Sequence, residues 1–113
     1  MEKFTPVADS LFESFEIDQS YLPVAENEDE RFHELRKILI RRIEELIEKD
    51  VEKLKWILYR IDVSEKKVHK ALTTNAQLHY PDLLADLIIE RQIEKARTRA
   101  SFNEGPSDWS FDV

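Results

Sequence analysis

Hydrophobic residues recur along residues 29–49 at the spacing of one helix face. Projected at about 100° per residue, five of them lie within roughly 60° of Phe32. Charged residues fill most other positions, so the pattern predicts an amphipathic helix from about Asp29 to Lys49 with one buried stripe. Besides Phe32, that stripe contains Leu35, Leu39, Ile43, Leu46 and Ile47.

A second helix is predicted over about residues 51–61. Asp50 has the side chain of a helix N-cap, and the apolar positions after it share one face. The apolar phase of the preceding segment almost continues through Asp50, so one bent helix over residues 29–61 is the alternative to two helices. The predicted core positions here are Leu54, Ile57, Leu58 and Ile61.

Two further helices complete the pattern. Ser64 is a good N-cap and predicts a short helix to about Thr73. Pro81 suits the first turn of a helix, and the residues after it predict a long helix to about Ser101. The first half of this long helix is apolar around most of its circumference, which predicts burial on several sides.

The two ends of the chain differ from its middle. Residues 1–27 are expected to be an acidic arm with a helix of one or two turns, because Ser10 and Glu13 have capping-box spacing. Residues 103–113 are an acidic tail that carries aromatic side chains. The expected fold is all-α: a compact bundle of about four helices, two long and two short, over residues 28–102, with irregular acidic arms.

Composition argues against several classes of enzyme. The 113 residues include no cysteine, which excludes disulfides and thiolate chemistry and suits a reducing cytoplasm. The single glycine, Gly105, leaves no glycine-rich phosphate loop or dinucleotide-binding turn. The longest apolar run, residues 83–89, is too short for a membrane span, and residues 1–15 lack the pattern of a secretory signal. We therefore predict a cytoplasmic protein that is not an enzyme and needs no cofactor.

The net charge of −7 is unevenly distributed. Residues 1–30 hold nine acidic residues and one lysine, whereas residues 31–72 hold twelve basic and eight acidic residues. Hydrophobic residues among acids suit a segment that folds on a partner, or one that packs on its own oppositely charged middle. We favour self-packing over a partner. The aromatic residues of the two arms assigned to a candidate interaction surface are Phe12, Phe15, Trp109 and Phe111.

Trp56 and Tyr59 project away from the predicted core stripe of their helix. With Leu54 at 0°, Tyr59 lies at about 140° and Trp56 at about 200°. A helix that is apolar on two faces is either flanked on both sides or part of an interface, and Trp and Tyr are enriched at interfaces. Both alternatives stand, and both residues join the candidate interaction surface.

Arg36 projects into the middle of the apolar stripe of residues 29–49. An unpaired guanidinium in that position would be costly to bury, so we predict an ion pair. The candidate partners are Asp62, Asp86 or an acid of the arms. An arginine that binds a ligand is the less favoured alternative.

Two other functions have weaker support. Basic residues in the middle of the chain would suit a regulator that binds nucleic acid or a ribosome, masked by the acidic arms, but they scatter around the predicted helices instead of forming one face. A metal site would rest on Glu30, His33, Glu65 and His69. Glu30 and His33 form half of a di-iron carboxylate motif, and the second Glu-x-x-His is missing, so we predict no metal.

Two segments resemble a family of small, uncharacterised, all-helical bacterial proteins: LYRIDVSE at residues 58–65 and PDLLADLIIERQ at residues 81–92. The resemblance extends over about residues 30–95 and implies a bacterial, cytoplasmic protein. The family has no assigned activity, so the resemblance implies no functional residue. From the residues themselves we predict a protein-interaction or assembly module that forms a homodimer or another homo-oligomer.

Overall fold

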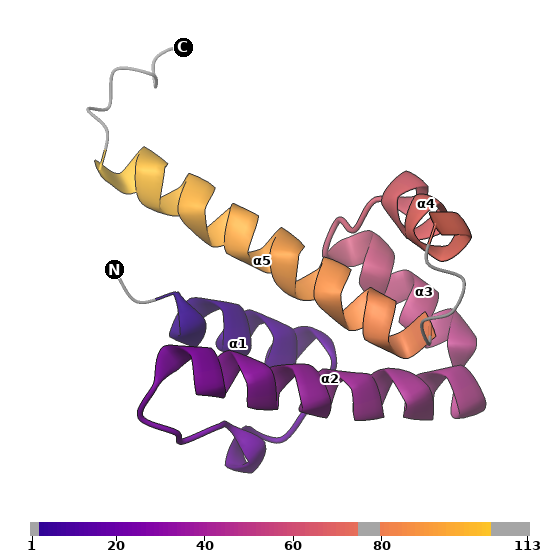
Figure 1. Cartoon of the computed structure of the whole chain (residues 1–113), viewed down its shortest axis with the longest axis horizontal. Helices are drawn as coiled ribbons and strands as arrows, with labels where there is room; N and C mark the ends of the chain where they lie inside the picture. Colours follow the sequence, from indigo (N-terminus) through magenta and orange to yellow (C-terminus); the bar gives the residue numbers. More distant parts are fainter. Residues whose placement is uncertain (1–2, 75–79, 105–113) are drawn as a thin grey trace.

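The fold consists of helices in the order α1, α2, α3, α4, α5 (Figure 1). The structure, a computed structural model, describes residues 3–74 and 80–104, without the side chains of residues 71, 72, 74 and 99–104. These residues contain no strand, which confirms the all-α prediction. The elements are α1 (Phe4–Ser14), a 3-10 turn (Gln19–Tyr21), α2 (Glu28–Lys49), α3 (Val51–Arg60), α4 (Glu65–Thr74) and α5 (Tyr80–Glu104).

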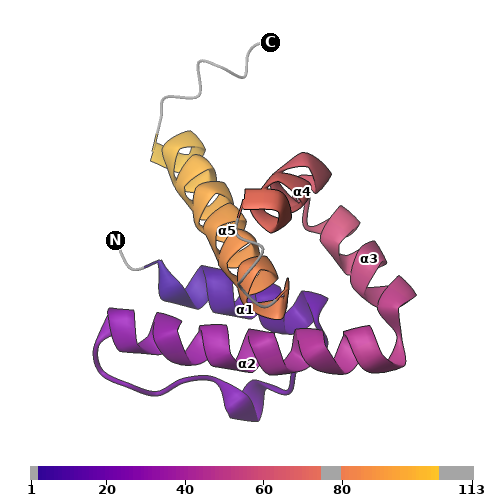
Figure 2. The same cartoon turned by 45° about the vertical axis from the view of Figure 1, so that its right-hand side comes forward.

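The two long helices, α2 and α5, pack on each other. α1 lies alongside α2, and α5 crosses both of them (Figures 1 and 2). α3 returns from the end of α2, and α4 packs on α5. The predicted boundaries of α2, α3, α4 and α5 all lie within about three residues of the observed ones.

α1 is longer and more deeply buried than the arm predicted for this region. It spans 11 residues, or about three turns, and lies against both α2 and α5. Ser10 is inside the helix, where its hydroxyl donates to Oε1 of Gln92 at 3.2 Å, so the predicted capping box does not form. The N-terminal region is therefore part of the bundle. The buried residues that line its inner face are Phe4, Val7, Ala8, Leu11, Phe12 and Phe15.

The N-terminus of α1 is capped by a side chain from another helix. Lys3, at the N-cap position, makes no side-chain cap. Instead, the backbone N–H groups of Lys3 and Phe4 donate to Oε2 of Glu28, at 2.8 and 3.2 Å. Glu28 is the first residue of α2, so the packing of α1 on α2 also satisfies backbone donors that a helix start leaves free.

α1 and α3 end in the same way, with a non-glycine residue in the left-handed region. Glu16 has φ 56° and Asp62 has φ 63°. After α3, the N–H of Val63 donates to the carbonyl of Leu58, and the N–H of Asp62 donates to that of Tyr59, both at 3.1 Å. This is the Schellman pattern, in which glycine usually occupies the position held here by Asp62. The chain therefore carries backbone strain at two helix ends.

α2 and α3 are two helices, which settles the alternative left open for residues 29–61. The helix breaks at Asp50, whose backbone is extended (φ −158°, ψ 72°). The Asp50 carboxylate accepts a hydrogen bond from the N–H of Lys53 at 3.2 Å, as its predicted N-cap role requires. Ile47, predicted to be in the core, is instead 39% exposed because it lies at the edge of the apolar stripe of α2.

The core lies where α1, α2 and α5 meet, and it includes one polar side chain. Gln92 of α5 is only 2% exposed, and its Nε2 has no hydrogen-bond partner among the described residues. The first half of α5 is buried on several sides, as predicted. Predicted core residues Ala71, Leu72 and Ala100 lie outside the described side chains. The buried residues of α2 and α5 are Leu35, Leu39, Ile43 and Leu46, then Leu83, Leu84, Ala85 and Ile88.

The left-handed backbone at Asp62 predicts a preference for glycine. Asp62→Gly and Asp62→Ala both remove the carboxylate, but only glycine adopts positive φ without strain. We expect the free energy of unfolding to be about 1 kcal/mol higher for the glycine variant, measured by urea denaturation. Glu44, exposed within α2, is the control position, where alanine should be the more stable variant by a similar amount.

The buried amide of Gln92 predicts that an apolar residue of similar size is stabilising. Gln92→Met removes the unsatisfied Nε2 donor from the core and keeps the side-chain volume. It also removes the acceptor of the Ser10 hydroxyl, but Ser10 is only half-buried and can bond to water instead, so we expect the free energy of unfolding to rise by about 1 kcal/mol. Gln92→Ala leaves a cavity and should lower it by about 2 kcal/mol. A loss of stability in the methionine variant would show that the hydrogen bond from Ser10 outweighs the cost of the unsatisfied Nε2.

Candidate protein-interaction surface

The surface that stands out is the side of α3 that faces away from the core. Leu54, Ile57 and Ile61 form the buried side of this helix. Six exposed residues occupy the opposite half of its circumference. We call them the outer face of α3: Val51, Glu52, Lys55, Trp56, Tyr59 and Arg60.

Two large aromatic side chains dominate the outer face of α3. Trp56 is 56% exposed and Tyr59 is 85% exposed. A helix with two apolar faces was expected to be either flanked by other helices on both sides or part of an interface. Among the described residues, α3 is not flanked on both sides. α3 lies at an edge of the molecule, beyond α4 and the end of α2 (Figure 2).

Charged residues surround Trp56 on this face. The Arg60 guanidinium lies over the Trp56 ring, 5.2 Å from its centroid, in a cation–π contact. Glu52 forms an ion pair with Lys55, with 3.4 Å between Oε2 and Nζ. Glu52 and Arg60 were not predicted as part of the surface, although their positions four residues before and after Trp56 place them beside it on a helix.

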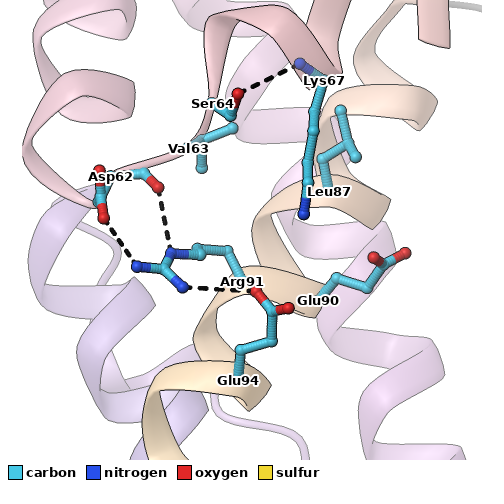
Figure 3. Close-up of a pocket in the computed structure, with 8 residues that line it drawn as sticks. All are labelled: Asp62, Val63, Ser64, Lys67, Leu87, Glu90, Arg91 and Glu94. Carbon is cyan, nitrogen blue, oxygen red and sulfur yellow. Dashed lines mark hydrogen bonds and ion pairs between the residues drawn. The ribbon is translucent and has the colours of Figure 1, made fainter. Parts of the chain in front are cut away.

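A small polar hollow separates the turn after α3 from α5 (Figure 3). It has a volume of about 240 Å³, and Arg91 of α5 spans it. Nη2 of Arg91 is 2.7 Å from Oδ2 of Asp62, and its Nε donates to the Asp62 carbonyl at 3.1 Å. Arg91 also contacts Glu94, at 3.4 Å. These contacts hold the end of α3 to α5, so Arg91 and Asp62 have a structural role.

Arg36 pairs with Asp86, one of its three candidate partners. Nε of Arg36 donates to Oδ1 of Asp86 at 2.7 Å, and Nη2 lies 3.4 Å from Oδ2. The side chains are 34% and 51% exposed, so the pair lies at the edge of the α2–α5 contact and outside the core. Asp62, the other named candidate, contacts Arg91 instead.

The aromatic residues of the two arms do not extend the surface. Phe12 and Phe15 are 1% and 0% exposed, so neither is accessible to a partner. Their assignment to an interaction surface is corrected: they pack on this molecule, because α1 turns them toward α2 and α5. Trp109 and Phe111 lie outside the described residues.

The residues considered for a metal site are not brought together. Among the described residues, no group of three or more His, Asp and Glu side chains is arranged to hold a metal ion. His33 is exposed on α2, and His69 is exposed on α4. Binding of nucleic acid or a ribosome stays the less favoured alternative.

No helix in the two described ranges combines the length and apolar character needed to cross a membrane. Comparisons with protein-family models, curated proteins and solved structures find no match for this chain. The resemblance to small bacterial proteins therefore stays a prediction, and functional inference rests on the residues themselves.

Proposed function

We propose that this chain is a non-enzymatic assembly module that associates with copies of itself through the outer face of α3. The observation that carries the proposal is the joint exposure of Trp56 and Tyr59, three residues apart on one helix. Side chains of this kind supply large, rigid contact area with a polar group at one end. In this proposal the module acts in the cytoplasm, because a chain without cysteine draws no benefit from an oxidising compartment.

The pKa shifts among the described residues also fit a structural protein. A side-chain hydrogen bond from Lys53 lowers the pKa of Glu16, and a backbone hydrogen bond from Ser20 lowers that of Asp18. Hydrogen bonds to Asp86 and Asp62 raise the pKa values of the guanidinium groups described above. The shifts of Glu16, Arg36 and Arg91 follow from contacts between different elements of the fold, and that of Asp18 follows from the local turn at Ser20. None of these contacts assembles the paired acid and base that a catalytic site uses.

Self-association predicts a mass that rises with protein concentration and depends on Trp56. Light scattering should give values between 13.4 kDa and twice that mass as the concentration increases. Because Trp56 occupies the centre of the proposed contact, Trp56→Ala should weaken the dissociation constant of the dimer by about 30-fold. Circular dichroism should show unchanged helix content, since the side chain lies outside the core.

Tyr21→Ala is the matched control for loss of an exposed aromatic side chain. Tyr21 is 65% exposed, and the 3-10 turn that contains it lies on the other side of α2 from α3 (Figures 1 and 2). This variant should associate like the wild type. A wild-type mass of 13.4 kDa at every concentration would refute the proposed function, as would equal association of the Trp56→Ala variant.

A further inference from the structure

The charges on the outer face of α3 are arranged around Trp56. Glu52 comes four residues before Trp56 and Arg60 comes four residues after it, so the three side chains form one column along the helix. The column is acidic near the N-terminal end of α3 and basic at its C-terminal end. A surface with this order complements a copy of itself that runs in the opposite direction.

We infer that two copies of the chain pair α3 against α3 in antiparallel orientation, with a two-fold axis at Trp56. Glu52 of each copy then faces Arg60 of the other, and the two Trp56 side chains meet at the axis. A parallel pair would instead place Glu52 against Glu52 and Arg60 against Arg60. The inference rests on the proposed self-association and specifies its geometry.

Contacts already present in one copy support this pairing. Arg60 is held along the helix by the Trp56 ring, so its guanidinium is positioned on the contact face before a partner arrives. In the pair, each Arg60 would lie between its own Trp56 and the carboxylate of the second copy. Antiparallel packing also places the positive N-terminal end of each helix dipole near a negative C-terminal end.

A second copy fits the surface better than the aromatic tail of the same chain. Arg91 contacts Asp62, which follows the end of α3. Along α5, Arg91 lies about 20 Å before Glu104. Trp109 follows Glu104 by five residues, which extend at most about 18 Å. Trp56 lies about 9 Å farther along α3 than Asp62. A route from Glu104 back along α5 to Asp62 and then along α3 to Trp56 is longer than these five residues, and we therefore propose a second copy as the occupant.

The size of the surface indicates a dimer of modest affinity. Trp56 and Tyr59 together expose roughly 300 Å². The stems of the neighbouring charged side chains add to this area, but the total stays below the ~800 Å² that each partner contributes to a standard interface. Association should therefore depend on concentration, and its geometry is best tested by exchanging charges.

Charge reversal tests the antiparallel pairing. In a dimer of the Glu52→Arg variant, the new arginine of each copy faces Arg60 of the other copy. In a dimer of the Arg60→Glu variant, the new glutamate of each copy faces Glu52 of the other copy. Each single variant should weaken the dissociation constant of the dimer by at least about tenfold. An equal mixture of the two variants restores both opposite-charge pairs and should form heterodimers with an affinity within about threefold of the wild type. Sedimentation measures the affinity, and native mass spectrometry identifies the heterodimer.

The controls separate this inference from the proposed function. Glu34→Arg makes the same change of charge at an exposed position near the other end of α2 and should leave association unchanged. A monomeric wild type would refute the proposed function itself. If the wild type associates but the single reversals do not weaken it, or their mixture restores nothing, the antiparallel pairing is wrong while self-association stands. Loss of association in Trp109→Ala/Phe111→Ala, with Glu52→Arg unaffected, would identify the tail of a second copy as the occupant.

Discussion

The burial of α1 against α2 and α5 is the interaction on which the rest of the fold depends. α2 and α5 cross, and α1 covers the apolar stripes that they share (Figure 1). Phe12 and Phe15 have almost no exposed surface, and each aromatic side chain buried in this way contributes about 2 kcal/mol or more. Without α1, the parts of α2 and α5 that it contacts would lie against solvent. The acidic N-terminal region is therefore a structural part of the bundle.

Polar contacts from α2 and α3 fix where α1 begins and ends. Glu28 caps its first N–H groups, and Nε of Arg42 donates to the carbonyl of Phe15 at 2.9 Å. Lys53 forms an ion pair with Glu16 just after the helix. Exposed pairs contribute little individually, but a cap satisfies backbone groups that would otherwise lack partners. Together these contacts define the register of α1, and only the Lys53–Glu16 pair among them joins opposite charges of the N-terminal region and the middle of the chain.

A feature of this fold could be predicted from the sequence where the residues that determine it lie close together along the chain. Asp50, Ser64 and Pro81 are local signals, and they marked the starts of α3, α4 and α5 correctly. The cap of α1 comes from Glu28, which is far from α1 in the sequence. The residues near α1 therefore predicted a helix that is too short. The partner of Arg36 was likewise undetermined, because only the crossing of α2 and α5 brings Asp86 to it. The outward orientation of Trp56 followed directly from the spacing of the apolar residues along α3.

The same spacing separates the core-facing side of α3 from its outer face. Leu54, Ile57 and Ile61 hold the helix to the core, so the outer face is free to vary without loss of packing. The two ends of α3 are fixed by the Asp50 cap and by the contact of Arg91 with the turn that follows it. A helix held at both ends presents its side chains in a defined geometry, and a partner then loses less entropy on binding. In the proposed dimer, this rigidity would let a surface of only six residues select one orientation of a second copy.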